Sequence, residues 1–178
     1  MPKPLSELFT LHGSDKDAPG GHSYGPVYDK LLTPRRGSLT AVLEVGVLGG
    51  SSIRAWRGWL PAWCRVVGID NNLTCGAIAG AELYQADSRD PESVRAALGD
   101  STFDVIVDDG GHGLWEQQPT WDALLPRLRP GGIYIVEDLQ HADAREWFAQ
   151  RDCVIHDFAA RTDRFDDCLA VFVKGVEA

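Results

Sequence analysis

Apolar, β-branched runs recur along the middle of the chain and alternate with segments whose apolar residues have helical spacing. Five runs predict strands at Ala41–Val45, Arg65–Ile69, Glu82–Ala86, Phe103–Val107 and Gly132–Val136. The segments between them predict helices at Ser51–Trp59, around Leu73–Ala79, at Pro91–Leu98 and at Leu114–Leu128. Pro130-Gly131-Gly132 reads as the break after the last of these helices. Because the strand runs are apolar on both faces, we expect a parallel sheet covered by helices on both sides.

The two ends of the chain have different patterns. The beginning is polar and rich in Gly and Pro, and it predicts short helices at Leu5–Leu11 and Tyr24–Leu32. Near the other end, Cys153–Ala159 and Cys168–Val173 read as strands separated by the polar segment Ala160–Asp167. That segment is too short for a helical crossover, so we predict an antiparallel hairpin.

The length of 178 residues suits one domain with a substantial core. We therefore divide the chain into an N-terminal helical cover segment, residues 1–37, and one α/β domain, residues 38–178. The chain has 17 Lys and Arg against 26 Asp and Glu, a net charge of −9. This balance disfavours nucleic acid and anionic membrane surfaces as partners. It leaves open whether the chain forms a homo-oligomer.

The beginning of the sequence and the cysteines indicate a cellular location. The opening MPKPLSELFT has no apolar stretch typical of a signal peptide, and no apolar run approaches membrane-spanning length. The four cysteines, Cys64, Cys75, Cys153 and Cys168, show no CxxC pairing, so we expect reduced thiols. We accordingly expect a cytoplasmic protein.

A glycine-containing turn, Glu44-x-Gly46-x-x-x-Gly50, follows the first predicted strand and opens the next helix. Glycines there permit a tight turn and the close approach of a ligand. The dinucleotide fingerprint requires Gly-x-Gly-x-x-Gly, and Leu48 stands at its second glycine. The pattern therefore disfavours a dinucleotide, and a turn without any ligand is the alternative.

Two acids end the second and third predicted strands. Asp70 stands about twenty residues after Gly50, where a carboxylate can accept hydrogen bonds from a ribose diol. Asp87 has the corresponding place one strand further out and suits an adenine amino group. For either acid alone, a solvated helix cap is the alternative. Their order on successive strand ends favours a nucleoside-containing ligand.

The fourth and fifth predicted strands each end in a pair of acids, Asp108-Asp109 and Glu137-Asp138. Neighbouring strands lie about 4.8 Å apart, so up to four carboxylates would converge. Such crowding is unfavourable unless protons or a cation neutralise it, and oxygen ligands suit Mg²⁺, Mn²⁺ or Ca²⁺ rather than zinc. The alternative is that some of these acids point away and cap helices.

His112 follows Asp109 by three residues in a glycine-rich loop. Imidazole titrates near neutrality and can take a proton from a hydroxyl group, so His112 is a candidate general base. A surface histidine without a role is the alternative. His22 and His141 are weaker candidates for a substrate pocket.

Taken together, the glycine turn, Asp70, Asp87 and the terminal hairpin resemble the class I S-adenosylmethionine-dependent methyltransferases over nearly the whole chain. A narrower segment, DDGGH with LPRLRPGGIYIVEDL, resembles the metal-dependent macrolide sugar O-methyltransferases of the mycinamicin type and the cephalosporin-hydroxylase-like group. The segment Gly13-Ser14-Asp15-Lys16, followed by Tyr24 and Tyr28, is similar to the Gly-Thr-Asp-Lys segment that precedes the core of these proteins.

The resemblance implies a Rossmann-like sandwich with a mostly parallel seven-stranded sheet and a C-terminal antiparallel hairpin. It implies an O-methyltransferase that uses S-adenosylmethionine and a divalent metal, with Mg²⁺ expected, on a diol or sugar-like hydroxyl of a small molecule. Asp109, Glu137 and Asp138 would be the metal ligands, and His112 the general base. The implied cofactor-binding residues are Ser14, Lys16, Tyr24, Glu44, Gly46, Gly50, Ser51, Asp70, Asn71, Asp87, Ser88 and Asp108.

Two other functions remain open from the sequence. A scaffold domain with the same fold would bind the cofactor weakly and have no turnover, although the intact acids and His112 argue against it. A nicotinamide-dependent oxidoreductase is disfavoured by Leu48 at the required glycine position.

Overall fold

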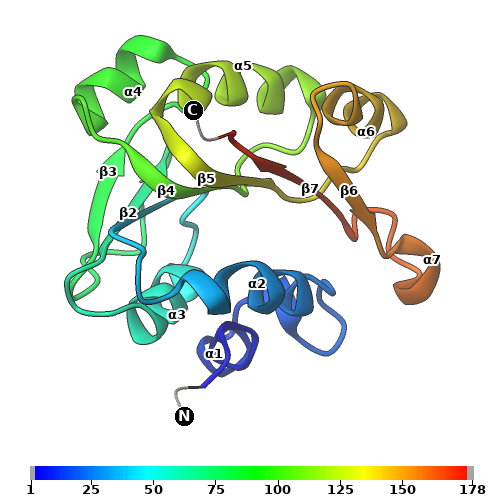
Figure 1. Cartoon of the computed structure of the whole chain (residues 1–178), viewed down its shortest axis with the longest axis horizontal. Helices are drawn as coiled ribbons and strands as arrows, with labels where there is room; N and C mark the ends of the chain where they lie inside the picture. The colour runs from blue at the N-terminus through cyan, green and yellow to red at the C-terminus, as the bar shows by residue number, and fades with distance from the viewer. Residues whose placement is uncertain (1–2, 176–178) are drawn as a thin grey trace.

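The computed structural model describes residues 3–175 and contains a seven-stranded sheet in the order β3-β2-β1-β4-β5-β7-β6 (Figure 1). The strands are β1 (Ala41–Val45), β2 (Arg65–Asp70), β3 (Glu82–Gln85), β4 (Phe103–Asp108), β5 (Leu128–Val136), β6 (Val154–Asp157) and β7 (Cys168–Val173). The first five are parallel, and β7 is antiparallel to both β5 and β6. The predicted fold class, including the C-terminal hairpin, is therefore confirmed.

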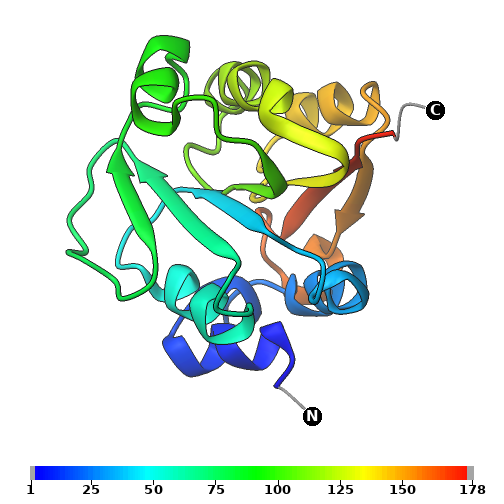
Figure 2. The same ribbon diagram turned by 60° about the vertical axis from the view of Figure 1, so that its left-hand side comes forward.

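Helices cover both faces of the sheet, as Figures 1 and 2 show from two directions. One face carries α1 (Leu5–His12), α2 (Gly25–Leu32) and α3 (Ser51–Trp59), and the other carries α4 (Pro91–Leu98), α5 (Leu114–Leu124) and α6 (Ala142–Ala149). A one-turn helix, α7 (Ala159–Thr162), lies between β6 and β7. Three short 3-10 helices complete the described elements, at Asp15–Asp17, Thr33–Arg35 and Leu125–Arg127.

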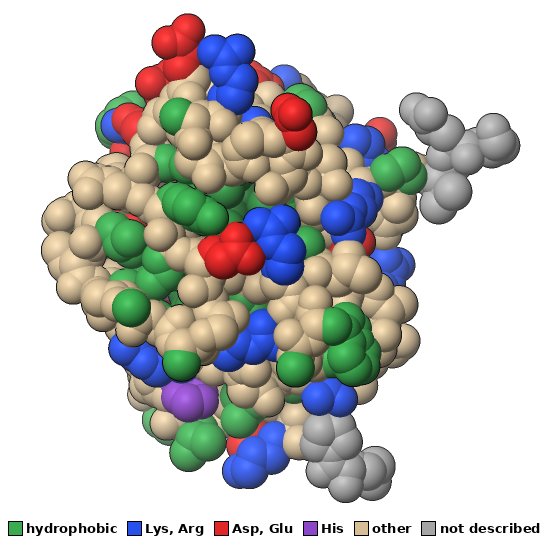
Figure 3. Space-filling model, turned by 90° about the vertical axis from the view of Figure 1, so that its left-hand side faces the viewer, with side chains coloured by type: hydrophobic (Ala, Val, Ile, Leu, Met, Phe, Trp, Pro, Cys, Tyr) green, Lys and Arg blue, Asp and Glu red, His purple; other side chains and the backbone are tan. Residues whose placement is uncertain are grey.

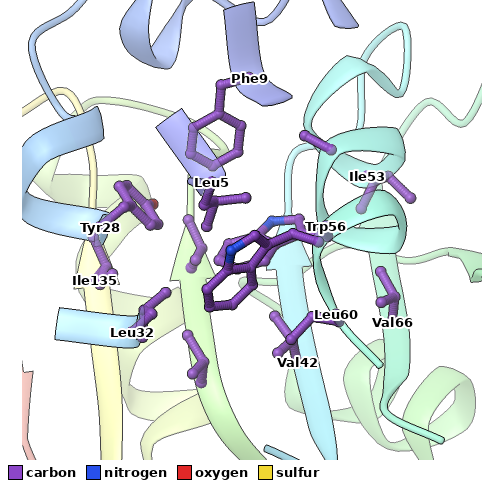
Figure 4. Packing of buried hydrophobic residues seen from close by; sticks show 14 of the residues in the cluster. Leu5, Phe9, Tyr28, Leu32, Val42, Ile53, Trp56, Leu60, Val66 and Ile135 are labelled. Carbon is purple, nitrogen blue, oxygen red and sulfur yellow. The ribbon is translucent and has the colours of Figure 1, made fainter. Parts of the chain in front are cut away.

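Aromatic side chains join the N-terminal helices to the sheet (Figure 4). Phe9 of α1 packs edge-on against Tyr28 of α2 and Trp56 of α3, with ring centroids 5.3 and 5.8 Å apart. All three are fully buried in one cluster with apolar residues of the sheet. Large rings bury much apolar area, so this cluster fixes the N-terminal helices against the sheet.

Two features of the predicted helices are wrong. Residues 73–79 form an irregular loop rather than a helix, and Gly76 within it takes a left-handed conformation with φ +69°, which a helix does not contain. The predicted helix over 114–128 ends at Leu124, and β5 already begins at Leu128. The segment read as a break, Pro130-Gly131-Gly132, lies inside β5 next to a shift in its register with β4. Helix α6 was not predicted, since its apolar pattern is short and weak.

The molecular face with the β3 edge carries charges of both signs (Figure 3). Lys and Arg side chains there are interspersed with Asp and Glu and do not gather into one patch. This face therefore has no strong field of a single sign. Separately, none of the helices between residues 3 and 175 is both long and apolar enough to cross a bilayer.

The four cysteines are unpaired in the described chain, as the sequence predicts, and they differ in burial. Burial raises the pKa of Cys64 to about 11 and those of Cys153 and Cys168 to about 12, whereas Cys75 is half-buried. Because the thiolate is the nucleophile, iodoacetamide at mildly alkaline pH is expected to label Cys75 first in the folded protein. Mass spectrometry of timed samples checks the order, with urea-unfolded protein as the control. Equal labelling rates for all four thiols in the folded protein would contradict the assignment.

Candidate active site

The site lies at the edge of the sheet where β1, β4 and β5 end. Val45 aligns with Asp108, and Asp108 aligns with Val136, so the residues that follow these strands meet side by side. Backbone hydrogen bonds continue past the strands, from Asp109 N to Val45 O at 3.0 Å and from Glu137 N to Asp108 O at 2.9 Å. Open α/β sheets bind ligands at this edge, and the strand register itself brings the acid pairs together.

The glycine turn after β1 is shaped by left-handed residues. Gly46 and Gly50 have φ angles of +85° and +78°, and Leu48, a residue that is 84% exposed, has +45°. A Cβ atom on Gly46 would lie 1.9 Å from the carbonyl oxygen of Asp109, so only glycine fits there. The turn consequently brings the backbone of β1 directly against the loop after β4.

Asp70 closes the same turn from the end of β2. Its Oδ2 accepts hydrogen bonds from Val47 N at 2.8 Å and Leu48 N at 3.0 Å, and its Oδ1 accepts one from Asn72 N at 2.8 Å. Partial burial would raise the pKa of Asp70, but these three backbone N–H groups outweigh it and lower the pKa. Asp70 is therefore a fixed carboxylate that faces the cavity.

Past the end of β3, the wall of the site is polar. The guanidinium of Arg89 donates to both carboxylate oxygens of Asp87, at 2.9 Å each. This pairing lowers the pKa of Asp87. Ser88 and Thr120 share a hydrogen bond of 2.9 Å between their hydroxyl oxygens. These side chains line the cavity at the β3 side.

On the other side of the cavity, Asp109, His112 and Asp138 form a group that can hold a metal ion. Each offers one ligand atom, and these atoms lie within 4.8 Å of one another. The Nε2 atom of His112 lies 3.5 Å from Asp138 Oδ2 and 3.9 Å from Asp109 Oδ1. The Nδ1 atom of His112 lies 3.2 Å from the amide nitrogen of Gln140, which orients the ring.

Asp138 is held from its inner side. Its Oδ1 accepts a hydrogen bond of 2.7 Å from Tyr24 Oη and lies 3.5 Å from His22 Nδ1. Its backbone has φ +56°, an uncommon conformation outside glycine that Asp tolerates better than most residues. Burial and Asp109 raise the pKa of Asp138. The contacts on Oδ1 leave Oδ2 directed toward His112.

A buried lysine joins the carboxylates on the inner side of the site. Lys16 Nζ lies 2.6 Å from Asp109 Oδ2 and 3.2 Å from Glu44 Oε1, and it also forms an ion pair with Glu137. Burial alone would lower the pKa of Lys16, but the three acids hold it well above its ordinary value. The second oxygen of Glu137 accepts a hydrogen bond from Tyr28 Oη.

These walls enclose a single cavity of about 420 Å³. It extends from Asp70 and Asp87 at one end to Asp109, His112 and Asp138 at the other, past the backbone of Gly46. That volume is within the range of about 300–1,000 Å³ typical of small-molecule sites. Asp70 and Asp87 therefore share one space with the group that can hold a metal ion.

The structure places the residues singled out from the sequence in two groups. Those that line the cavity are Gly46, Asp70, Asn71, Asp87, Ser88, Asp109, His112 and Asp138. Those that lie outside its lining are Ser14, Lys16, Tyr24, Glu44, Gly50, Ser51, Asp108 and Glu137. Several of the second group support the first: Gly50 caps the start of α3, Tyr24 holds Asp138, and Lys16 pairs with Asp109.

Asp108 and Glu44 are both fully buried. Asp108 accepts a hydrogen bond of 3.3 Å from Gly110 N, and burial raises its pKa to about 8. Glu44 accepts a hydrogen bond of 2.8 Å from the indole nitrogen of Trp56. Their contacts are with protein groups around the cavity rather than with its open space.

Sequence reasoning missed the contacts that hold the acids of this site. It assigned Lys16 and Tyr24 to the cofactor and not to the acids, and it gave no role to Tyr28 with Glu137 or to His22 with Asp138. The one available signal was the presence of Lys16, Tyr24 and Tyr28 in the segment that precedes the core. Apart from Glu44, their partners lie more than ninety residues later in the chain, and the sequence pattern does not indicate such pairs.

Comparison with known proteins identifies relatives of this chain by sequence. No protein-family model matches the chain. The chain is 35% identical, over 76% of its length, to 8-demethyl-8-alpha-L-rhamnosyl tetracenomycin-C 2'-O-methyltransferase from Streptomyces olivaceus. It is 32% identical, over 66% of its length, to mycinamicin VI 2''-O-methyltransferase from Micromonospora griseorubida. The chain spans 38% and 32% of the lengths of these two proteins.

Solved structures agree with the sequence relatives. MycE methyltransferase from the mycinamycin biosynthetic pathway, in complex with Mg, SAH and mycinamycin VI, superposes with a TM-score of 0.81 at 22% identity. The match covers 98% of this chain and 54% of that one, so the described fold corresponds to about half of that protein. At this identity the superposition shows the shared fold, while the sequence relatives show the relationship. The chain belongs to the class I S-adenosylmethionine-dependent methyltransferases, close to the macrolide and sugar O-methyltransferases.

Proposed function

We propose that this chain transfers the methyl group of S-adenosylmethionine to a sugar-like hydroxyl of a natural product, with the help of a divalent ion, Mg²⁺. In this reaction the hydroxyl oxygen bonds to the methyl carbon, the carbon–sulfur bond breaks, and the hydroxyl proton leaves. The relatives named above are O-methyltransferases of sugars on such compounds. The division into a cover segment, residues 1–37, and a catalytic domain, residues 38–178, is part of this proposal.

One observation carries the proposal: carboxylates suited to a nucleoside and a group suited to a metal ion line the same cavity. Asp70 and the Gly46 turn suit the ribose of the cofactor, and Asp87 suits its adenine. Asp109, His112 and Asp138 lie across the same cavity, where the reacting hydroxyl would meet the methyl group. A negatively charged site also favours a cofactor with a cationic sulfonium and amine.

The donor groups fit a hard divalent ion. Carboxylate oxygens are the ligands that Mg²⁺ prefers, and those of Asp109 and Asp138 face the cavity. Asp109, Glu137 and Asp138 would hold the ion, although Glu137 is engaged with Lys16 and Tyr28 in this structure. When bound, the ion would lower the pKa of an acceptor hydroxyl.

The protein's own residues orient the reactants and take up the proton. The amide nitrogen of Gln140 can donate a hydrogen bond to the Nδ1 atom of His112. With the amide turned over, its oxygen can instead accept a hydrogen bond from a protonated Nδ1. In the second arrangement the lone pair of Nε2 faces the cavity, and His112 is the base for the hydroxyl proton. Tyr24 and His22 keep the Asp138 carboxylate turned toward this point.

Methyl transfer to a rhamnosylated polyketide acceptor tests the proposal. We expect S-adenosylhomocysteine and a singly methylated acceptor to form in equal amounts, as measured by liquid chromatography and mass spectrometry. EDTA should stop the reaction and excess Mg²⁺ should restore it. Cofactor binding without any transfer to several glycosylated acceptors would favour a scaffold domain, and undiminished transfer in EDTA would exclude the role of the ion.

Replacing Asp70 with alanine is expected to weaken the binding of S-adenosylhomocysteine by roughly tenfold or more, since hydrogen bonds to a charged group contribute about 1.5–3 kcal/mol. Calorimetric titration measures the affinity. Asp104→Ala is a matched control, because Asp104 also accepts two backbone N–H bonds, from Thr40 and Ala41, outside the cavity lining. The control should lose stability but keep its affinity. An unchanged affinity in Asp70→Ala would place the ribose elsewhere.

A further inference from the structure

Lys16 is a buried cation among three acids that come from three different strands. Glu44 lies within β1, Asp109 follows β4 and Glu137 follows β5. The ammonium group forms ion pairs with all three, and Lys16 is only 1% exposed. It therefore contacts two of the proposed metal ligands without itself lining the cavity.

The backbone holds this ammonium in place. Tyr24 N donates to Lys16 O at 3.0 Å, and the preceding Ser14 N donates to Phe9 O at 2.9 Å. Phe9 in turn is part of the buried aromatic cluster with Tyr28 and Trp56. The charge of Lys16 is thus presented to the strand ends by a segment fixed in the core.

The positive charge of Lys16 has two effects on the acids around it. Carboxylates at adjoining strand ends repel one another unless a cation neutralises them, and Lys16 supplies one positive charge to three acids. Three carboxylates and one ammonium carry a formal net charge of −2, which still attracts a divalent ion. However, Lys16 is bound to Asp109 Oδ2 and to Glu137 Oε2, oxygens on the same carboxylates that the ion would use.

We propose that Lys16 is a resident counter-cation that keeps these carboxylates together when no ion is bound and competes with the divalent ion for Asp109 and Glu137. Lys16 thereby lowers the affinity of the site for the ion and makes the ion exchangeable. This inference rests on the proposed function, since it takes a divalent ion as the ligand of these acids.

Binding of Mn²⁺ to the full chain tests the inference, measured by calorimetric titration without cofactor or acceptor. Lys16→Met keeps an unbranched side chain, one heavy atom shorter, and removes its charge. We expect it to bind Mn²⁺ roughly tenfold more tightly than the unsubstituted protein, about 1.4 kcal/mol, and to unfold at a lower temperature in the absence of the ion. Lys30→Met is the control, because it makes the same change of charge on α2, outside the ion pairs of the site. The affinity of Lys30→Met for Mn²⁺ should stay within about threefold of that of the unsubstituted protein.

Each result of this titration supports or overturns the competition between Lys16 and the divalent ion. A folded Lys16→Met variant with unchanged or weaker Mn²⁺ binding overturns the inference. If this variant is unfolded without the ion, recovery of the native circular dichroism spectrum on titration with Mn²⁺ supports the inference, and failure to recover overturns it. Methyl transfer that persists in EDTA would instead count against the proposed function, whereas the binding isotherms judge Lys16 independently of turnover.

Discussion

Replacing Gly46 with alanine is expected to abolish methyl transfer and to destabilise the protein by about 2–4 kcal/mol. Two costs add at this position. A left-handed φ of +85° is unfavourable for any residue with a Cβ atom, and that atom would lie 1.9 Å from Asp109 O and 2.6 Å from Asp109 C. The overlap involves backbone and not the end of a flexible side chain, so the loop that carries Asp109 and His112 must move.

The neighbouring Gly49 provides a matched control in the same turn. A Cβ atom on Gly49 would have no atom of the described chain within 4 Å apart from its own residue and its two chain neighbours, and its φ is not in the left-handed region. Gly49→Ala should therefore change the free energy of unfolding by less than about 0.5 kcal/mol and keep activity. Urea unfolding and initial rates compare the two variants. Equal stability and activity in both would show that the contact between the Gly46 turn and the Asp109 loop is not needed.

The alternation of apolar runs and helical segments was sufficient to predict the sheet. Strands with apolar residues on both faces, such as β1 and β4, must be covered on both sides, and this requirement gives the three-layer arrangement. The order of the acids on strand ends then placed Asp70, Asp109 and Asp138 at one edge, which is where the structure has them. Local pattern and global fold agree in these elements.

The start of β5 and the role of Lys16 depended on contacts that the local sequence pattern does not contain. The beginning of β5 was missed because Pro130-Gly131 breaks most strands, but here the pair lies beside a register shift where a missing N–H is tolerated. Lys16 was assigned to the cofactor because its segment precedes the core, whereas its ammonium contacts Asp109, 93 residues away. Such a pairing follows from the topology, which brings a cover segment and three strand ends together.

His112 has two possible roles in this site, and kinetics with ion binding separates them. As the general base, it would contribute a factor of about 10²–10⁴ to the rate, and its loss would leave the ion in place. As an ion ligand with Asp109 and Asp138, its loss would weaken ion binding. Its distances of 3.5 and 3.9 Å from the two carboxylates allow both roles.

We expect His112→Gln to lower kcat by about 10²–10⁴ and to change the affinities for Mn²⁺ and S-adenosylhomocysteine by less than about threefold. The reason is that carboxylates already supply the oxygen ligands that Mg²⁺ prefers, while His112, whose ring is oriented by Gln140, is the basic group beside them that lines the cavity. His141→Gln is the control, since His141 is exposed at the start of α6 and does not line the cavity. Parallel losses of kcat and Mn²⁺ affinity in His112→Gln would make His112 an ion ligand. The hydroxyl proton would then need another acceptor, and Asp109 and Asp138 are the carboxylates closest to His112.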